Sequence, residues 1–359
     1  MGGRLLTLAL TGALAASAAS PASAQFYKDK TLSLLINYGI GGNADTEARV
    51  YQRYLPKYIA GHPSVIIQNA PGAGGLKAMN MLGLDIGSRA DGLTAGYFTI
   101  SATAIMVGDP ALKVTLDDFA IVSGARGWNV VYARKDMPPG LTKPADIAKA
   151  TKVFIGGYSR ASSHDTRLRL AMEVFGVPYT AVVGFPGTAD VNKAMLQNEI
   201  NLSGSSLPGY QTQVIPNIVK PGIGLVLFHY PIIGSDGRPA GNPSLEAQGI
   251  RTLDKVYEEA FGKPPSGPKF EALLLMNDIG TQLQRAILLP RNTPEDAVRA
   301  LREAMRGVAN DEGFRADYEK VTGEKPDIVF ANELEPLFER LRKMDPKINQ
   351  VLKDSIDGK

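Results

Sequence analysis

Short apolar runs alternate with helix-length segments along the chain from residue 31 onward. The runs are brief and often apolar at every position, which is typical of strands in parallel sheets that helices cover on both faces. We predict strands at residues 32–37, 64–68, 93–99, 119–122, 130–133, 153–156, 179–183, 225–229 and 285–289. The alternation of these strands with helix-length segments predicts an α/β fold.

Helical periodicity fills several of the segments between these runs. From Ala44 to Tyr58, apolar residues recur every three or four positions, and Asn43 is the expected N-cap. A later helix is predicted to open with Thr293 as a hydroxyl cap and Pro294 at its first helical position. Its apolar positions, from Val298 to Val308, are expected to be buried.

Two proline-rich stretches, residues 137–140 and 262–268, bracket a middle block that has strands and helices of its own. The segment 234–249 is rich in Gly, Pro, Asn and Ser and predicts a surface loop, and residues 335–352 predict one or two final helices. A middle block inserted into a first domain would give two lobes joined by crossing strands. We therefore expect lobe 1 to comprise residues 25–123 and 270–359, and lobe 2 to comprise residues 124–269.

The first 24 residues have the order of a secretory signal peptide. Arg4 precedes the small and apolar stretch 5–19, and Ala22-Ser23-Ala24 forms a small-x-small cleavage site. Cleavage before Gln25 would leave a chain of two middling domains. The chain has no cysteine, which excludes disulfides, thiolate zinc sites and cysteine nucleophiles. These features together predict a periplasmic protein.

A glycine-rich turn follows the first predicted strand. Gly39-x-Gly41-x-x-Ala44 fits the dinucleotide fingerprint, in which a strand leads to a helix whose N-terminus holds a pyrophosphate. The acidic residue that would bind the ribose is missing, because the next strand ends in Gln68-Asn69. Dinucleotide binding, purely structural glycines and a small-anion site are the three interpretations, and the missing ribose partner favours the last.

A second turn, residues 68–78, follows the neighbouring strand. It is not a phosphate loop, because Lys77 precedes Ala78 where Ser or Thr is required. Glycines here also suit a loop with unusual backbone angles. Turns after neighbouring parallel strands nevertheless share the carboxyl edge where open α/β sheets bind ligands. We expect the two turns to form one wall of a site.

The middle block repeats this strand, turn and helix pattern at residues 155–166 and 182–195. Ser162 or Ser163 can cap a helix that begins near His164. Ser163-His164-Asp165 is not a triad, because adjacent residues cannot point in series at one atom, and without a G-x-S-x-G elbow hydrolysis is rejected. Helix N-termini that face one cleft would attract a carboxylate or another small anion.

Composition and spacing exclude other partners. The net charge of +3 at pH 7, with no clustered basic excess, argues against nucleic acid. His62, His164 and His229 are scattered, and the residues that follow Asn43 lack the glycine and glutamate of a calcium loop. We expect no metal and no cofactor. Trp128 is expected to pack near the join between the lobes.

Taken together, the motifs resemble the substrate-binding proteins of tripartite tricarboxylate transporters, the Bug family. The first turn, Gly39 to Asp45, is similar to the family's P-x-G-G-x-x-D, and Pro71-Gly72-Ala73-Gly74-Gly75 matches its P-G-A-G-G. Four more segments resemble family motifs in the same order, at residues 91–95, 161–164, 185–191 and 289–298. The resemblance runs from about Tyr27 to the C-terminus, and the ordered set carries it.

The resemblance implies a two-lobed, clam-like periplasmic binding protein, each lobe a mainly parallel sheet flanked by helices. Its cleft would close on a small organic anion without enzymatic activity. The ligand-binding residues implied are Tyr38, Gly41, Gly42, Asn43, Ala44, Asp45, Gly72, Ala73, Gly74 and Ser101 in the first lobe, and Ser159, Arg160, Ser162, Ser163, His164, Gly187, Thr188, Ala189 and Asp190 in the second. Asp45, being anionic, is expected to order its loop rather than touch a carboxylate.

We therefore expect a monomeric periplasmic receptor that delivers an organic anion to the membrane subunits of a transporter. Arg160 departs from the small residue common in the family, and a hypothesis follows that it binds a second anionic group of the ligand. The alternatives are an exported α/β enzyme and a sensory receptor with the same binding chemistry.

Overall fold

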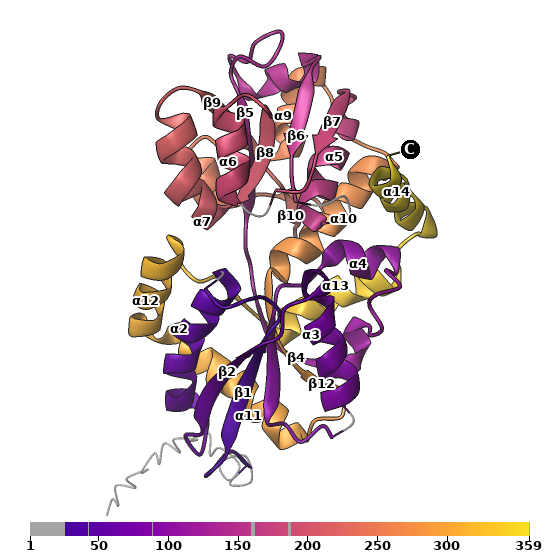
Figure 1. Ribbon diagram of the computed structural model, residues 1–359. Helices are drawn as coiled ribbons and strands as arrows, with labels where there is room; N and C mark the ends of the chain where they lie inside the picture. Colours follow the sequence, from indigo (N-terminus) through magenta and orange to yellow (C-terminus); the bar gives the residue numbers. More distant parts are fainter. Residues whose placement is uncertain (1–25, 42, 88, 159–161, 186–187, 359) are drawn as a thin grey trace, which may run out of the picture.

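The computed structural model describes residues 26–41, 43–87, 89–158, 162–185 and 188–358. The predicted signal peptide lies outside these residues. No helix within them is both long enough and apolar enough to cross a membrane. The described residues form two lobes, one above the other in Figure 1.

The first lobe is built on a sheet whose strands lie in the order β13-β4-β12-β3-β1-β2. These strands are β1 Thr31–Ile36, β2 Ser64–Asn69, β3 Thr94–Phe98, β4 Phe119–Ala125, β12 Arg285–Pro290 and β13 Ile328–Phe330. The helices that flank the sheet or extend its turns are α2 Asn43–Tyr58, α3 Leu76–Asn80, α4 Ala102–Val107, α11 Glu295–Asn310, α12 Glu312–Thr322 and α13 Ala331–Arg342. Shorter 3-10 and π turns are η1 Ala73–Gly75, η2 Met81–Ile86 and η3 Leu116–Asp118.

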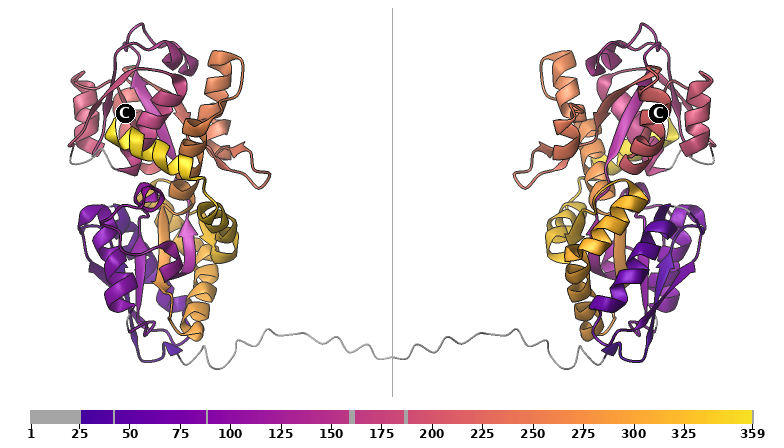
Figure 2. Two further views of the ribbon diagram at one scale, coloured as in Figure 1. Left: turned by 90° about the vertical axis from the view of Figure 1, so that its right-hand side faces the viewer. Right: turned by 90° about the vertical axis from the view of Figure 1, so that its left-hand side faces the viewer.

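The second lobe holds a sheet in the order β7-β6-β8-β5-β9. Its strands are β5 Asn129–Arg134, β6 Val153–Gly156, β7 Tyr179–Val182, β8 Leu202–Ser206 and β9 Gly224–His229. Its other elements are η4 Pro144–Lys149, α5 Ser163–Phe175, α6 Thr188–Leu196, α7 Leu207–Gly209, η5 Tyr210–Val219, the strand pair β10 Ile232–Ile233 and β11 Pro239–Ala240, α8 Pro243–Ala247 and α9 Leu253–Phe261. Figure 2 shows the β10–β11 hairpin projecting from the side of the molecule.

The chain passes between the lobes through β4 and β5 on the way up and through α10, Pro268–Gln282, on the way back to β12. At this connection the backbone N–H of Gly127 donates to the carbonyl of Thr281 (2.9 Å), so the two passages are bonded to each other. The last helix, α14 Pro346–Asp357, lies against both lobes. Asn349 donates to the carbonyl of Met106 in α4, and Arg169 in α5 donates to the carbonyl of Ser355. The exact residue limits of the lobes stay a prediction.

The predicted two-lobed α/β architecture is confirmed, and each of the nine predicted strands is present with ends within three residues of the prediction. Strand β8 was missed because its sequence, LSGSS, resembles a loop; β5 and β6 enclose it on either side. The sheets are mixed: β12 is antiparallel to β3 and β4, and β5 is antiparallel to β8 and β9. These two strands enter from the other lobe, so they run against most of their neighbours.

Three local predictions need correction or refinement. Segment 234–249 is not only loop, since it contains β11 and α8. The N-cap of α11 is Pro294 without a side-chain cap bond, and the buried hydroxyl of Thr293 has no hydrogen-bond partner among the described residues. Residues 335–352 fall in two helices, α13 and α14, which settles the alternative that the sequence left open.

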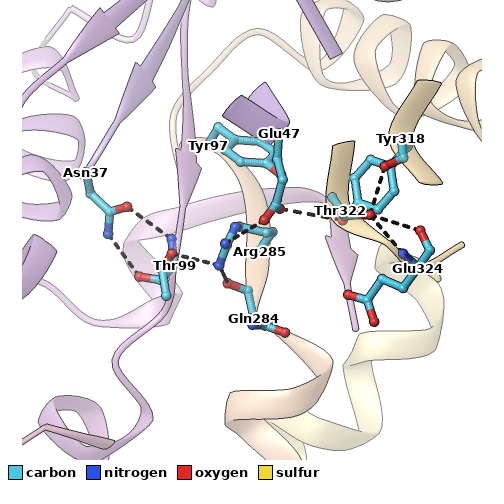
Figure 3. A network of polar contacts seen from close by, with 9 residues as sticks. All are labelled: Asn37, Glu47, Tyr97, Thr99, Gln284, Arg285, Tyr318, Thr322 and Glu324. Atoms are coloured by element: carbon cyan, nitrogen blue, oxygen red, sulfur yellow. Dashed lines mark hydrogen bonds and ion pairs between the residues drawn. The ribbon is translucent and has the colours of Figure 1, made fainter. Parts of the chain in front are cut away.

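A buried ion pair joins elements that are far apart in the first lobe (Figure 3). Arg285, at the start of β12, donates through Nη2 to Oε1 of Glu47 in α2 (2.8 Å) and through Nη1 to Oγ1 of Thr99 after β3 (3.0 Å). Tyr97 donates to the other Glu47 oxygen at 3.0 Å. Burial lowers the pKa of Arg285, but Glu47, Tyr97 and Tyr318 together outweigh burial, so the net pKa is raised.

Glu324 lies beside this pair (Figure 3). Burial first, and then the negative charge of Glu47, raise the pKa of Glu324 to about 8. Glu324 is therefore mostly neutral at pH 7, and Glu47 is the carboxylate that pairs with Arg285.

Removing the charge of Glu47 tests the importance of this pair. Glu47→Gln leaves Arg285 buried without a counter-charge, so we expect the free energy of unfolding to fall by about 3–5 kcal/mol in urea titrations at pH 7. Arg299→Gln is the control, because its partner Asp296 forms a half-exposed pair on one helix, and its cost is expected to stay below about 1 kcal/mol. Equal costs for the two variants would contradict the assignment.

Candidate functional site

A cavity of about 530 Å³ lies between the lobes, at the carboxyl ends of the parallel strands of both sheets. The first lobe contributes Tyr38, Ala73, Gly74, Leu76, Thr99, Ile100, Ser101, Ala104 and Asp109. The second lobe contributes Asn129, Tyr158, Ser162, Ser163, His164, Arg167 and Ser206, and Gly280 and Gln284 line it from the connection. This is the sheet edge at which open α/β folds bind ligands.

The second glycine turn reaches the cavity because of its backbone. Residues 72 to 75 all have positive φ angles, of 142°, 48°, 62° and 97°. At Gly75 a side chain is also blocked, since a Cβ would lie 2.4 Å from Nδ2 of Asn37. The turn thereby places Ala73 and Gly74 in the cavity wall, where the hydroxyl of Tyr38 donates to the carbonyl of Gly74 at 3.3 Å.

Asn37 holds the ends of β1 and β3 side by side. Its side-chain amide donates to the carbonyl of Thr99 (2.9 Å) and accepts from the Thr99 N–H (3.1 Å). Thr99 and Ser101 follow β3 in the cavity wall, and the Ser101 hydroxyl accepts from the N–H of Ala104 as the N-cap of α4. This strand end is therefore fixed by side-chain bonds rather than left as a free loop.

Asp45 orders the first turn, as the sequence suggested. Its carboxylate accepts from the N–H of Gly41 (2.9 Å), from Asn69 at the end of β2 (3.0 Å) and from Arg49. Burial raises the pKa of this carboxyl, but the hydrogen bonds from Arg49, Gly41 and Asn69 outweigh burial and lower it. Asp45 is almost fully buried and takes no part in the cavity lining.

Several predicted contact residues do not line the cavity in this structure. Among the described residues these are Gly41, Ala44, Asp45, Gly72 and Asp190; the side chains of Asn43, Thr188 and Ala189 lie outside the described part of the structure. In the first lobe Tyr38, directly before the glycine turn, lines the cavity where residues 41–45 were expected to. Gly42, Ser159, Arg160 and Gly187 lie outside the described residues, so the hypothesis for Arg160 stays a prediction.

The start of α5 forms the second-lobe wall. Ser162 is the N-cap, since its hydroxyl accepts from the N–H of Asp165 (3.1 Å), and Asp165 in turn accepts from Ser162 and from the N–H of Tyr158. Gly157 is required here, because a Cβ would lie 1.8 Å from the Asp165 carboxylate. Ser163 accepts from the N–H and the hydroxyl of Thr103 in α4, so the two lobes touch at the cavity floor.

His164 lines the cavity as a neutral group. Burial, followed by the charge of Arg167, lowers the pKa of His164 to about 3. Its ring lies against Tyr158, with 4.8 Å between the ring centroids. Among the described residues, no cluster of three His, Cys, Asp or Glu side chains is placed to hold a metal ion.

The sequence reasoning missed Arg167, Tyr158, Thr99, Asn129, Ser206, Gly280 and Gln284. Arg167 is buried, and it donates through Nε to the carbonyl of Ser163 (3.2 Å) and through Nη1 to Oδ1 of Asn277 in α10 (3.0 Å). A signal for it existed, because Arg167 follows His164 by three positions and Ser163 by four, which places it on the same helix face. The cavity thus combines one buried cation, Arg167, and one carboxylate, Asp109, with a neutral imidazole, hydroxyls and amides.

No protein-family model matches the sequence, and no curated protein matches it. Solved structures are similar over nearly its whole length. A TctC solute binding protein from Polaromonas without ligand gives a TM-score of 0.65 at 16% identity, covering 91% of this chain and 99% of its own. The periplasmic binding protein BugD gives 0.60 at 16% identity, covering 92% and 98%. MatC from Rhodopseudomonas palustris, with bound malate, gives 0.58 at 18% identity, covering 91% and 99%. The chain therefore has the clam-shell fold of these proteins.

Two histidines with lowered pKa values predict a pH dependence of stability. Burial lowers the pKa from 6.5 to about 3 for His164 and to about 4 for His229, whose Nε2 accepts from the N–H of Asn242. Below about pH 6.5 the unfolded chain binds protons at these histidines that the folded chain does not, so their contribution lowers stability as the pH is lowered. Glu324, whose pKa is raised to about 8, binds its proton in the folded state over the same range and acts in the opposite direction. We expect a loss of up to about 1.4 kcal/mol per histidine per pH unit between pH 6.5 and 5.

Urea titrations at several pH values measure this slope. His229→Gln is expected to lower it by up to about 1.4 kcal/mol per pH unit, since Gln can accept from Asn242 without binding a proton. His62→Gln, at an exposed histidine, is the control and is expected to keep the slope. An unchanged slope in His229→Gln would show that carboxyl groups cause the dependence instead.

Proposed function

We propose that this protein is a periplasmic receptor that binds a small organic anion between its lobes and delivers it to a membrane transporter of the tripartite tricarboxylate type. One observation carries the proposal. The interlobe cavity contains Arg167, a buried cation that forms no ion pair with a described carboxylate, among mostly neutral hydrogen-bonding groups and one carboxylate, Asp109. A cavity of this kind binds an anion rather than a neutral or cationic solute.

The fold supports a capture mechanism. The similar proteins include solute-binding and periplasmic binding proteins, and one of them, MatC, holds malate. In this chain the lining residues come from both lobes and from the connection. A ligand that contacts all three favours the closed arrangement in proportion to its extra contacts there. The closed shape is the form that a membrane partner would recognise.

The proposed binding residues follow from the cavity. From the sequence-based set these are Tyr38, Ala73, Gly74, Ser101, Ser162, Ser163 and His164. The secretory signal at residues 1–24, if cleaved, would place this receptor in the periplasm. The first-turn residues 41–45 support the wall indirectly, through the contacts of Asp45 with Gly41 and Asn69.

A thermal-shift screen of the chain lacking residues 1–24 tests this function. Malate, succinate, glutarate, citrate and NADH are compared, and we expect at least one carboxylate to raise the melting temperature with concentration and without turnover. At about 100 times its Kd such a ligand stabilises the folded state by about 2.7 kcal/mol. Trp128, the single tryptophan, lies at the passage between the lobes and gives a fluorescence readout of closure.

Matched variants locate the site. Ser206→Phe fills the cavity and is expected to abolish the carboxylate shift, whereas Ser266→Phe, on an outer groove lined by Pro265 and Tyr257, is expected to retain it. A shift with NADH alone, or a carboxylate shift that survives Ser206→Phe, would contradict the proposal.

A further inference from the structure

Arg167 is a buried positive charge that no described Asp or Glu neutralises. Its exposed fraction is 8%, and its hydrogen bonds within the described residues go to a backbone carbonyl and to the amide of Asn277. It forms no ion pair with any described Asp or Glu, and the residues outside the described ranges include no Asp or Glu at all. No described Asp or Glu therefore neutralises Arg167, and an anionic ligand in the cavity would supply the missing negative charge.

A comparison with Arg285 shows how unusual it is that Arg167 has no acidic partner among the described residues. Arg285 is buried to a similar extent, and Glu47 neutralises it at 2.8 Å. Burial lowers the pKa of Arg167, and only the neighbouring Tyr230 acts in the opposite direction. An arginine stays protonated at neutral pH even so. Keeping such a charge buried and unpaired is strongly unfavourable, and an anionic ligand would relieve this cost.

Arg167 lines the cavity, and its contacts with the described residues leave one of its two amino groups available to a ligand. The ring of Tyr230 lies 5.6 Å from the guanidinium carbon, and Nε and Nη1 are occupied by Ser163 and Asn277. Nη2 forms no hydrogen bond within the described part of the chain, and Arg167 lines the cavity. Among the described lining residues Asp109 is the one carboxylate, and it accepts from the N–H of Ala111.

The position of Arg167 is also where three parts of the fold meet. It lies on α5 of the second lobe and bonds to α10 of the connection through Asn277. A Cβ on Gly280 would lie 3.5 Å from Nη1 and 3.9 Å from the Cβ of Ala102 in α4. One helical turn before Arg167, Ser163 accepts from Thr103 of the first lobe. An anion at this point would contact the floor of the cleft rather than its rim.

We propose that Arg167 is the second-lobe anchor for an anionic group of the ligand and selects ligands with two carboxylates over analogues in which one is neutral. This inference rests on the proposed function. A ligand carboxylate would accept from Nη2 of Arg167 in a charge-assisted hydrogen bond, which is about twice as strong as the bond that a neutral amide oxygen accepts. One carboxylate of the ligand would lie at the first-lobe wall, and the other on Arg167.

Calorimetry with succinate, glutarate and malate, and with the half-amides of succinate and glutarate, tests the anchor in the chain lacking residues 1–24. The variants are Arg167→Gln, Arg167→Lys and, as a control for net charge, Arg238→Gln on the exposed β10–β11 hairpin. We expect the unaltered protein and Arg238→Gln to bind a diacid at least about tenfold more tightly than its half-amide.

In Arg167→Gln the affinity for the diacid is expected to fall at least about tenfold, and the ratio of diacid to half-amide affinity to approach about two, the statistical value for two equivalent orientations. Arg167→Lys keeps the charge and is expected to retain part of the ratio. An equal loss for both ligands in Arg167→Gln would leave the ratio of their affinities unchanged. That result would show a purely structural role for Arg167 and overturn the anchor, while leaving the receptor function intact. Absence of carboxylate binding in the unaltered protein would overturn the receptor function and the anchor together.

Discussion

The ion pair between Arg285 and Glu47 is the contact on which the first-lobe wall depends. It joins the strand that returns from the second lobe to the helix that follows the first glycine turn, and it bonds to Thr99 at the cavity edge. Because these elements are distant in sequence, no local propensity holds them in register. A buried pair of this kind adds little net stability over an apolar core, but it penalises every arrangement that separates the partners. Its contribution is therefore to fix where the strand ends lie.

The two buried arginines of the cleft region differ in what neutralises them. Arg285 has Glu47, and the neighbouring Glu324 stays neutral because burial and Glu47 raise its pKa to about 8. Arg167 has a backbone carbonyl and an amide, which orient the guanidinium without removing its charge. The Arg285–Glu47 pair is neutral and has a structural role. Arg167 keeps an uncompensated positive charge at the place where both lobes and the connection meet. Recognition of an anion and stabilisation of the closed lobes would then be the same event.

The fold could be predicted well because its determinants are local or periodic. Apolar runs marked the strands, and a three-to-four residue repeat marked α2 and α11, whose apolar faces are buried. Strand β8 could not be found in this way, since its serines and glycine form a strand only between β5 and β6. The antiparallel direction of β12 and β5 is equally non-local, because it follows from which lobe the chain has just left. The Thr293 cap failed for a different reason: the helix begins at Glu295, one residue later than a cap at Thr293 requires.

The site was predicted in part. As with the fold, the features set by local sequence were found, and those set by packing between distant segments were missed. Glycine turns are visible in sequence, because positive φ angles at Gly72, Gly74 and Gly75 demand glycine wherever the chain lies in space. Which turn reaches the cavity depends on the relation of one lobe to the other, and the first turn is instead tied down by Asp45. The importance of Arg167 depends on an absence, the lack of an acidic partner, and a sequence with 36 acidic residues cannot show which of its arginines is left unpaired. Only the packing of α5 against α4 and α10 decides that, so the residue that gives the cavity its charge is the one that motif matching had the least means to find.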